Sequence, residues 1–144
     1  MRHDPFSPTK RSWIMRQVQS RDTKPELLVR SLAHRLGYRF RLHQRTLPGA
    51  PDLVFSSRRK VIFVHGCFWH GHPCRRGARP PKTNAEYWFT KISRNKERDK
   101  RHRRQLRQLG WSVLILWECQ LRDQKKLAAR LSRFLEQPAK GREA

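Results

Sequence analysis

Residues 66–83 are rich in Gly, Pro, Cys and His, and follow neither the helical nor the strand period. A segment this long without regular structure in a compact domain is usually functional or held by something other than a hydrophobic core. It contains three soft metal ligands, Cys67, His72 and Cys74, and the remaining cysteine, Cys119, follows a later apolar stretch. Four N and S ligands can close a tetrahedral structural zinc site. The spacing favours zinc over the alternative, reduced core cysteines beside a solvated histidine.

The net charge points to a polyanionic partner. The 144 residues include 34 Lys and Arg against 11 Asp and Glu, a formal net charge of +23, and a charge of this size favours a nucleic acid. An anionic membrane surface is the weaker alternative. No apolar run approaches the roughly 18 residues of a spanning helix. No signal peptide is visible, and an odd number of cysteines argues against a disulfide framework, so we expect a cytoplasmic protein.

Helix signals begin at Thr23, which can cap a helix that has Pro25 in its first turn. Leucines then recur every four residues as far as Leu36, and Gly37 can end the helix in the left-handed region. Strands are predicted at 38–42, 52–55, 60–65 and 111–117. Further helices are predicted at 9–19, at 84–109 with Asn84 as its cap, and from Asp123 onward.

This order of elements predicts an α/β fold with a central mixed sheet and helices on both faces. We divide the chain into a basic N-terminal arm or helix at 1–22, one folded domain at 23–136 and a flexible tail at 137–144. The short length is consistent with a single domain.

An acidic residue and two histidines form a second candidate cluster. Asp52 begins one strand of a predicted hairpin and His65 ends the other, so the hairpin would bring Asp52 close to the end of strand 60–65. A carboxylate with a neighbouring main-chain carbonyl suits Mg²⁺. A neutral histidine, His65 or His70, could take a proton from an attacking water. From these residues alone, a turn aspartate and histidines satisfied in the core remain the alternative.

The predicted helix 84–109 has an apolar face that polar residues interrupt. At steps of four and three, this face carries Trp88, Ile92, Asn95, Asp99, His102, Leu106 and Leu109. Burying the Asp99 carboxylate costs several kcal/mol unless it is paired. Its partner could be a basic side chain or a catalytic histidine, and both remain open. The basic residues lie mostly on the other faces, where we expect a track for phosphates: Lys91, Arg94, Lys96, Arg98, Lys100, Arg101, Arg103 and Arg104.

Phe68 and Trp69 are adjacent aromatic residues that cannot both alternate into one core. In a basic protein, large exposed aromatic side chains can wedge between stacked bases. The alternative is that one of the two packs on the zinc loop. Trp88 and Met15 are further candidates for base contact, although the spacing of Trp88 is typical of a core residue.

Residues 65–74 resemble the signature of the very short patch repair (Vsr) DNA mismatch endonucleases. Further similar segments are 16–26, 47–52, 95–99 and 117–119, so the resemblance covers most of residues 9–136. It implies a restriction-endonuclease-like fold with a structural zinc. It also implies a Mg²⁺-dependent enzyme that nicks one strand of double-stranded DNA beside the thymine of a T·G mismatch, which arises when 5-methylcytosine is deaminated. A DNA cytosine-5 methyltransferase and mismatch-repair proteins would be functional partners.

Positions in the family motif imply individual roles. Asp52 matches the Mg²⁺-binding aspartate, and Val64 stands where a main-chain carbonyl is expected to bind the metal, a position at which some relatives carry Thr. His70 matches the proposed general base and His65 an accessory catalytic histidine. The residues expected to support this shell are Glu26, Asp99 and Asn95.

The same resemblance implies the zinc ligands and the base-stacking residues. The zinc ligands match Cys67, His72, Cys74 and Cys119. The residues that enter the DNA stack match Phe68, Trp69 and Trp88, with Met15 approaching from the other groove. We expect a monomer, since a single mismatch lacks two-fold symmetry. Another nicking or restriction nuclease of the same fold, a non-catalytic zinc-containing DNA-binding module and an RNA-binding protein are the alternatives.

Overall fold

The computed structural model describes residues 23–74 and 84–138. Its helices are α2 (Lys24–Arg35), α3 (Ala85–Gln108) and α4 (Gln124–Glu136), and its strands are β1 (Arg41–Leu42), β2 (Leu53–Phe55), β3 (Lys60–His65) and β4 (Ser112–Trp117). Two short 3-10 turns, η1 (Ser56–Arg58) and η2 (Glu118–Gln120), follow β2 and β4. The order of elements from Thr23 onward is the predicted one. The expected helix 9–19, which includes Met15, and the end of the tail lie outside the described residues.

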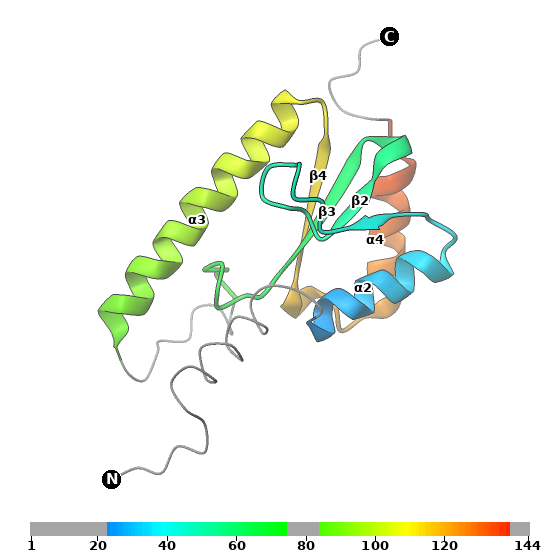
Figure 1. Cartoon of the computed structure of the whole chain (residues 1–144). Helices are drawn as coiled ribbons and strands as arrows, with labels where there is room; N and C mark the ends of the chain where they lie inside the picture. The colour runs from blue at the N-terminus through cyan, green and yellow to red at the C-terminus, as the bar shows by residue number, and fades with distance from the viewer. Residues whose placement is uncertain (1–22, 75–83, 139–144) are drawn as a thin grey trace, which may run out of the picture.

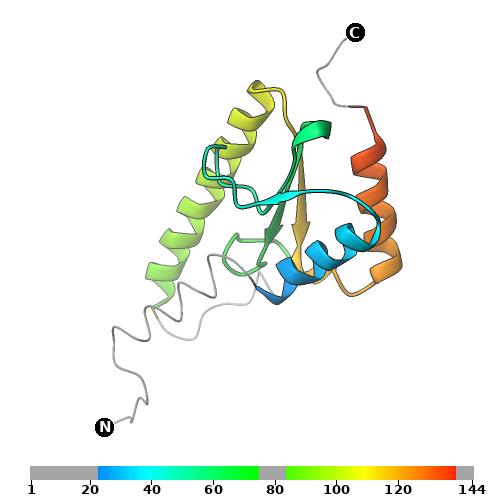
Figure 2. The ribbon, with the colours of Figure 1, turned by 45° about the vertical axis from the view of Figure 1, so that its right-hand side comes forward.

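The four strands form one mixed sheet in the order β1-β2-β3-β4. The β1–β2 and β2–β3 pairs are antiparallel, and β3–β4 is parallel, with α3 as the connection between its two strands. Helix α3 lies on one side of the sheet, and α2 and α4 lie on the other (Figures 1 and 2). The prediction of a mixed sheet covered by helices on both faces is therefore confirmed.

Side chains alternate along the central strands and build two apolar cores. Leu53 and Ile62 face α2 and α4 in the larger core, whereas Val61 and Phe63 face the α3 side, where Leu106 is fully buried. Each fully buried side chain of this kind stabilises the fold by about 1.5–3 kcal/mol. His65 has the same strand parity as Val61 and Phe63, so the last side chain of β3 falls on the α3 side, where the polar cluster lies.

The N-terminal half of α3 packs on the segment 66–74 instead of the sheet. A Cβ placed on Gly71, whose φ is +64°, would lie 2.8 Å from Cγ2 of Ile92, so the backbone at Gly71 packs directly on side chains of α3. The apolar face predicted for this helix, which Asn95, Asp99 and His102 interrupt, is half-buried from Trp88 to His102 and fully buried at Leu106. Leu109 was predicted on the same face but is 54% exposed, because the helix ends at Gln108 and turns at Gly110 toward β4.

The predicted caps are largely confirmed. The Thr23 hydroxyl accepts from the backbone N–H of Glu26, and Asp123 accepts from two N–H groups of the first turn of α4. Gly37, with φ +89°, follows α2. Asn84 is the N-cap of α3 as expected, with a φ of +52°, although its side chain makes no capping hydrogen bond.

The strand predicted at 38–42 is much shorter than expected. Only Arg41 and Leu42 pair with β2, and Phe40 does not extend the pairing to Phe55 at the end of β2. Tyr38 and Phe40 instead pack their rings on Phe55, with ring centroids 6.5 and 5.8 Å away. Side-chain packing therefore holds this segment where the strand ladder does not. Within the described ranges, no helix is both long and apolar enough to span a lipid bilayer.

Candidate active site

Asp52 lies directly before β2, beside the end of β3, as the hairpin prediction required. The backbone N–H of Val64 donates a hydrogen bond to Oδ2 of Asp52 at 2.7 Å. The carboxylate borders a cavity of about 700 Å³, which Val64, His65, His70 and Asp99 also line. The hairpin, the loop after β3 and α3 thus each contribute predicted site residues to the same space.

Glu26 reaches Asp52 from the first turn of α2. Its side chain is 2% exposed and pairs with Arg30 at 3.0 Å and with Nε2 of His43 at 2.9 Å. Burial, and after it the hydrogen bond with Glu26, raise the pKa of the Asp52 carboxyl to about 8, against the opposing effects of the Val64 N–H and Arg30. Two buried carboxyl groups in contact favour a shared proton or a bound cation between them.

Glu26, His43 and Asp52 offer metal-ligand atoms that lie within 4.8 Å of one another. No sequence pattern marks His43 as a site residue. The register of the sheet is the signal that could have found it, because pairing of Leu42 with Leu53 puts His43 opposite Asp52. Its backbone N–H donates to the Asp52 carbonyl at 3.4 Å.

His70, His65 and Asp99 form a second polar group on the α3 side of the cavity. The rings of His65 and His70 stack with centroids 3.7 Å apart and planes inclined by 4°. Nδ1 of His70 lies 2.5 Å from Oδ2 of Asp99. Burial would raise the pKa of Asp99, but the hydrogen bond to His70 and nearby positive charges outweigh burial and lower it. Asp99 therefore stays ionised. Of the two partners that the sequence left open for it, a basic side chain or a histidine, the hydrogen bond identifies the histidine.

His65 is held neutral. Burial, and after it the neighbouring His70, lower its pKa to about 3. Its Nδ1 is buried without a hydrogen-bond partner among the residues that the structure describes. A buried, neutral and unsatisfied ring nitrogen beside a polar cavity is suited to accept a hydrogen bond from a bound water.

Basic residues complete the cavity wall. Arg98, His102 and Arg103 of α3 line it, as does Arg45. A Cβ on Gly49, whose φ is +77°, would meet the His102 ring at 2.9 Å, so the turn before Asp52 packs tightly on α3. Arg98 and Arg103, expected mainly on the outer faces of α3, thus also reach the cavity, where their charges can attract a phosphate.

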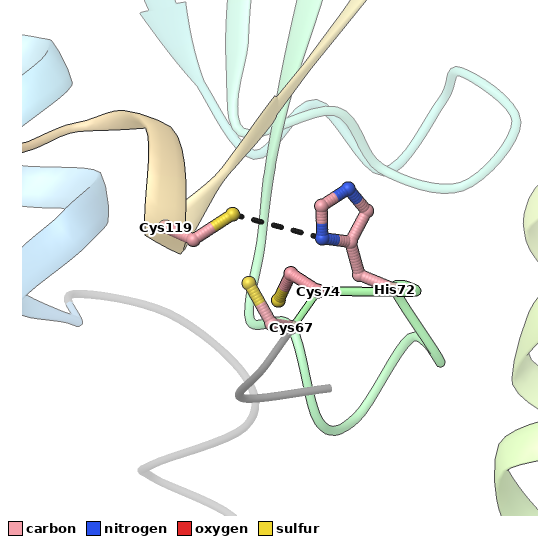
Figure 3. Close-up of side chains that lie close together, drawn as sticks. All are labelled: Cys67, His72, Cys74 and Cys119. Carbon is pink, nitrogen blue, oxygen red and sulfur yellow. Dashed lines mark hydrogen bonds between the residues drawn. The ribbon is translucent and has the colours of Figure 1, made fainter. Parts of the chain in front are cut away.

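The four predicted soft ligands come together below this cavity. Figure 3 shows Cys67, His72 and Cys74 on the segment after β3 and Cys119 on the turn after β4, with their side chains converging. Their ligand atoms lie within 4.8 Å of one another, and Sγ of Cys119 is 3.6 Å from Nδ1 of His72. The parallel pairing of β3 with β4 brings remote Cys119 to the cluster, since both strands end there.

The cluster is built like a metal site. The His72 ring stacks on Trp117 with centroids 4.2 Å apart, which fixes the orientation of the imidazole. Burial raises the pKa of the Cys67 thiol to about 12, which disfavours a free thiolate, whereas a divalent cation favours one. Two sulfurs and an imidazole from one short segment, joined by a third sulfur, are the donor set of a closed zinc site.

The three candidate stacking residues form one aromatic cluster. Phe68, Trp69 and Trp88 contact one another edge to face, with ring centroids 5.2–5.8 Å apart. All three are half-buried, so Trp88 is not a core residue. Asn95 donates from Nδ2 to the Trp69 carbonyl at 2.9 Å and thereby holds the loop that carries the cluster.

Comparisons with known proteins agree with this site. The family model described as DNA mismatch endonuclease Vsr matches residues 3–76. The chain is 53% identical over 133 residues to the type II nicking enzyme V.XorIIP of Xanthomonas oryzae pv. oryzae, covering 92% of this chain and 97% of that enzyme.

Two further relatives point the same way. Identity is 46% over 124 residues to the DNA mismatch endonuclease Vsr of Escherichia coli, covering 86% of this chain and 79% of that protein. It is 40% over 134 residues to the type II nicking enzyme V.NmeAIP of Neisseria meningitidis serogroup A, covering 93% and 95%. The chain therefore belongs to the Vsr family of DNA mismatch endonucleases and is a DNA endonuclease.

Proposed function

We propose that this endonuclease nicks one strand of duplex DNA beside the thymine of a T·G mismatch, in a Mg²⁺-dependent hydrolysis. The observation that carries the proposal is the shared cavity, which Asp52 and the Val64 main chain border on one side and the His70–Asp99 pair on the other. A phosphodiester at this position would meet a carboxylate and an imidazole together.

Asp52 and the Val64 carbonyl are the residues that would hold the Mg²⁺. The fit follows from the buried contact between Asp52 and Glu26, which is unfavourable when both are ionised without a cation. Bound there, the ion supplies Lewis-acid polarisation of the scissile phosphate and stabilises the leaving oxygen. Glu26 supports this shell from α2.

His70 is the general base in this mechanism. An ionised carboxylate can only accept hydrogen bonds, so Nδ1 of His70 carries the ring proton and donates a hydrogen bond to Asp99. Nε2 is then the basic nitrogen that takes a proton from the attacking water. Asp99 stabilises the imidazolium that forms, and the neutral His65 ring stacked against it adds no competing positive charge.

Recognition of the mismatch falls to the aromatic cluster. Wedging Phe68, Trp69 and Trp88 into the stack costs least where stacking is already weakened, as at a mismatch. Met15 joins them in the proposal on the strength of the family resemblance, but lies outside the described residues. Basic residues of α3 bind the flanking phosphates without regard to sequence.

We infer a structural zinc at Cys67, His72, Cys74 and Cys119, and a restriction-endonuclease-like fold for residues 23–136. The arm at 1–22 would contact DNA. A cytoplasmic monomer that works alongside a cytosine-5 methyltransferase and mismatch-repair proteins fits a repair role. The carboxylate–histidine cavity argues against the non-catalytic DNA-binding module and the RNA-binding protein, since neither needs a buried acid pair.

The deciding experiment is incubation with Mg²⁺ and a panel of end-labelled duplexes. T·G duplexes in varied flanking sequences are compared with fully paired controls, and products are resolved by strand. We expect cleavage of the T-containing strand alone, and none without a divalent ion. Equal cleavage of paired and mismatched duplexes would favour the second candidate, a nicking enzyme for another target, which the names of two relatives support.

A further inference from the structure

His43 occupies an unusual position beside Asp52. It follows β1 with a backbone φ of +46°, a conformation that is costly for a residue other than glycine and that clusters at functional sites. The strained backbone turns the imidazole toward the carboxylates of Glu26 and Asp52. The ring also lines the same cavity as His70.

The ring contacts determine which nitrogen carries the proton. Nε2 of His43 lies 2.9 Å from Oε1 of Glu26, and the Arg30 guanidinium holds the other oxygen of that carboxylate at 3.0 Å. The Arg30 guanidinium also lies 3.0 Å from Nε2, and because a guanidinium can only donate, Nε2 accepts this hydrogen bond and Nδ1 carries the ring proton when no cation is bound. A cation at Nδ1 requires the other tautomer, in which the proton is on Nε2 and faces the carboxylate of Glu26, which can accept it.

With the proton on Nε2, Nδ1 would present a lone pair to Oδ1 of Asp52, which lies 3.7 Å away. Two electron-rich atoms facing each other at this distance can share one cation. The arrangement of Glu26 behind the imidazole is also the one in which a carboxylate orients a metal-bound histidine through its other ring nitrogen.

We propose that His43 is a ligand of the catalytic metal, coordinating it through Nδ1 beside Asp52, with Glu26 as the carboxylate that orients the ring. The inference rests on the proposed metal site at Asp52 and adds a nitrogen donor to it. Imidazole ligands favour Mn²⁺ and Co²⁺ relative to Mg²⁺, whereas an all-oxygen site favours the harder ion. His43 thus tunes which divalent ions the enzyme accepts.

The test measures Mn²⁺ binding, without DNA, to the full chain loaded with one equivalent of zinc. Pulsed EPR detects the coupling of bound Mn²⁺ to a ¹⁴N nucleus, and calorimetry gives the affinities for Mn²⁺ and Mg²⁺. We expect a directly bound nitrogen in the wild type. His43→Gln should lose the nitrogen coupling and weaken Mn²⁺ binding by about 10- to 100-fold, with a smaller loss for Mg²⁺.

His34→Gln is the matched control, because His34 is an exposed histidine of α2. It should keep both the coupling and the affinity, and circular dichroism and zinc content should be unchanged in both variants. The assignment would be overturned if the wild type showed no nitrogen coupling or if the coupling persisted in His43→Gln. It would also be overturned if the coupling were lost in His70→Gln and not in His43→Gln.

Asp52→Asn separates this inference from the proposed function. If Asp52→Asn retains full Mn²⁺ binding, the metal site itself is misplaced, and both proposals fail. If Asp52→Asn loses the ion while His43→Gln keeps it with its nitrogen coupling, the catalytic site stands and only the role of His43 is refuted.

Discussion

Nδ1 of His70 donates to Oδ2 of Asp99 over 2.5 Å, from a loop to the middle of α3. Asp99→Asn should lower kcat for nicking by about 10- to 100-fold, because an amide can turn its N–H toward Nδ1 and favour the tautomer without a basic Nε2. KM should change little, since DNA contacts remain. Steady-state nicking of a T·G duplex measures both constants.

Glu97→Gln is the control for that substitution. Glu97 is an exposed acid two positions earlier on the same helix, so its variant removes the same charge away from His70. An equal loss of kcat in both variants would reduce the role of Asp99 to overall charge.

Asp52→Asn should make the protein more stable in Mg²⁺-free buffer, increasingly so at higher pH. The folded-state pKa of Asp52, about 8, lies above its ordinary value of 3.8. The neutral carboxyl is therefore tolerated at low pH, and stability is lost as pH rises through about 8. The gain from Asn should grow from near zero at pH 4 to on the order of 5 kcal/mol at pH 9, since each unit of pKa difference corresponds to about 1.4 kcal/mol. Urea unfolding of the zinc-loaded protein across this range measures it.

Mg²⁺ supplies the complementary arm of the same measurement. Saturating Mg²⁺ should stabilise the wild type, because it binds the folded state only, and should leave Asp52→Asn unchanged. Equal stabilisation of the two proteins would move the ion away from Asp52.

Removing one soft ligand should unfold the loop after β3. His72→Ala should release the zinc and lower the melting temperature by at least about 10 °C, because metal binding contributes directly to folding free energy. His34→Ala, at an exposed position on α2, should keep the metal. Metal content by mass spectrometry and thermal unfolding are the measurements; a His72→Ala protein with full zinc would contradict the ligand set.

The aromatic cluster should control substrate choice more than binding strength. Phe68→Ala with Trp69→Ala should abolish the preference for T·G over paired duplex, while affinity for random duplex falls only slightly. Phe89→Ala, at a 75% exposed site of α3, should keep the preference. Competition binding measures the affinity for each of the two duplexes. An equal loss of affinity for both would argue against insertion of these side chains at the mismatch.

The sequence predicts most of this molecule where periodicity or ligand spacing carries the information. The helical periodicity of α3 predicted that Asp99 lies on the half-buried face. Cys119, although remote in sequence, was assigned to the zinc cluster because it follows a predicted strand. The short β1 could not be predicted, because its extent depends on tertiary packing: Tyr38 and Phe40 pack their rings on Phe55 and do not join the strand. His43 was missed because its proximity to Glu26 and Asp52 comes from strand register and a left-handed backbone, which the spacing of residues in the sequence does not show.

The roles of neighbouring basic residues on α3 also depend on the fold. Arg103 lines the cavity that holds Asp52, and its Nε is buried with no hydrogen-bond partner in the described part of the chain. Arg104 lies beside it in sequence but is exposed and does not line that cavity; it borders an open hollow with Lys100 and Arg107, which Arg103 also lines. Adjacent arginines of α3 thus differ in position: Arg103 reaches the cavity beside Asp52, and Arg104 does not.

Arg103→Met should therefore reduce kcat for nicking by about 10-fold or more, because a guanidinium in the cavity stabilises charge that develops on the phosphate. Arg104→Met should leave kcat unchanged and weaken binding equally for paired and mismatched DNA, lowering the salt dependence of affinity by about one counterion. Single-turnover nicking and binding from 50 to 200 mM salt separate the two effects. If both variants lose only affinity, Arg103 is one more basic residue that binds DNA phosphates, and the transition state of cleavage is stabilised without its guanidinium.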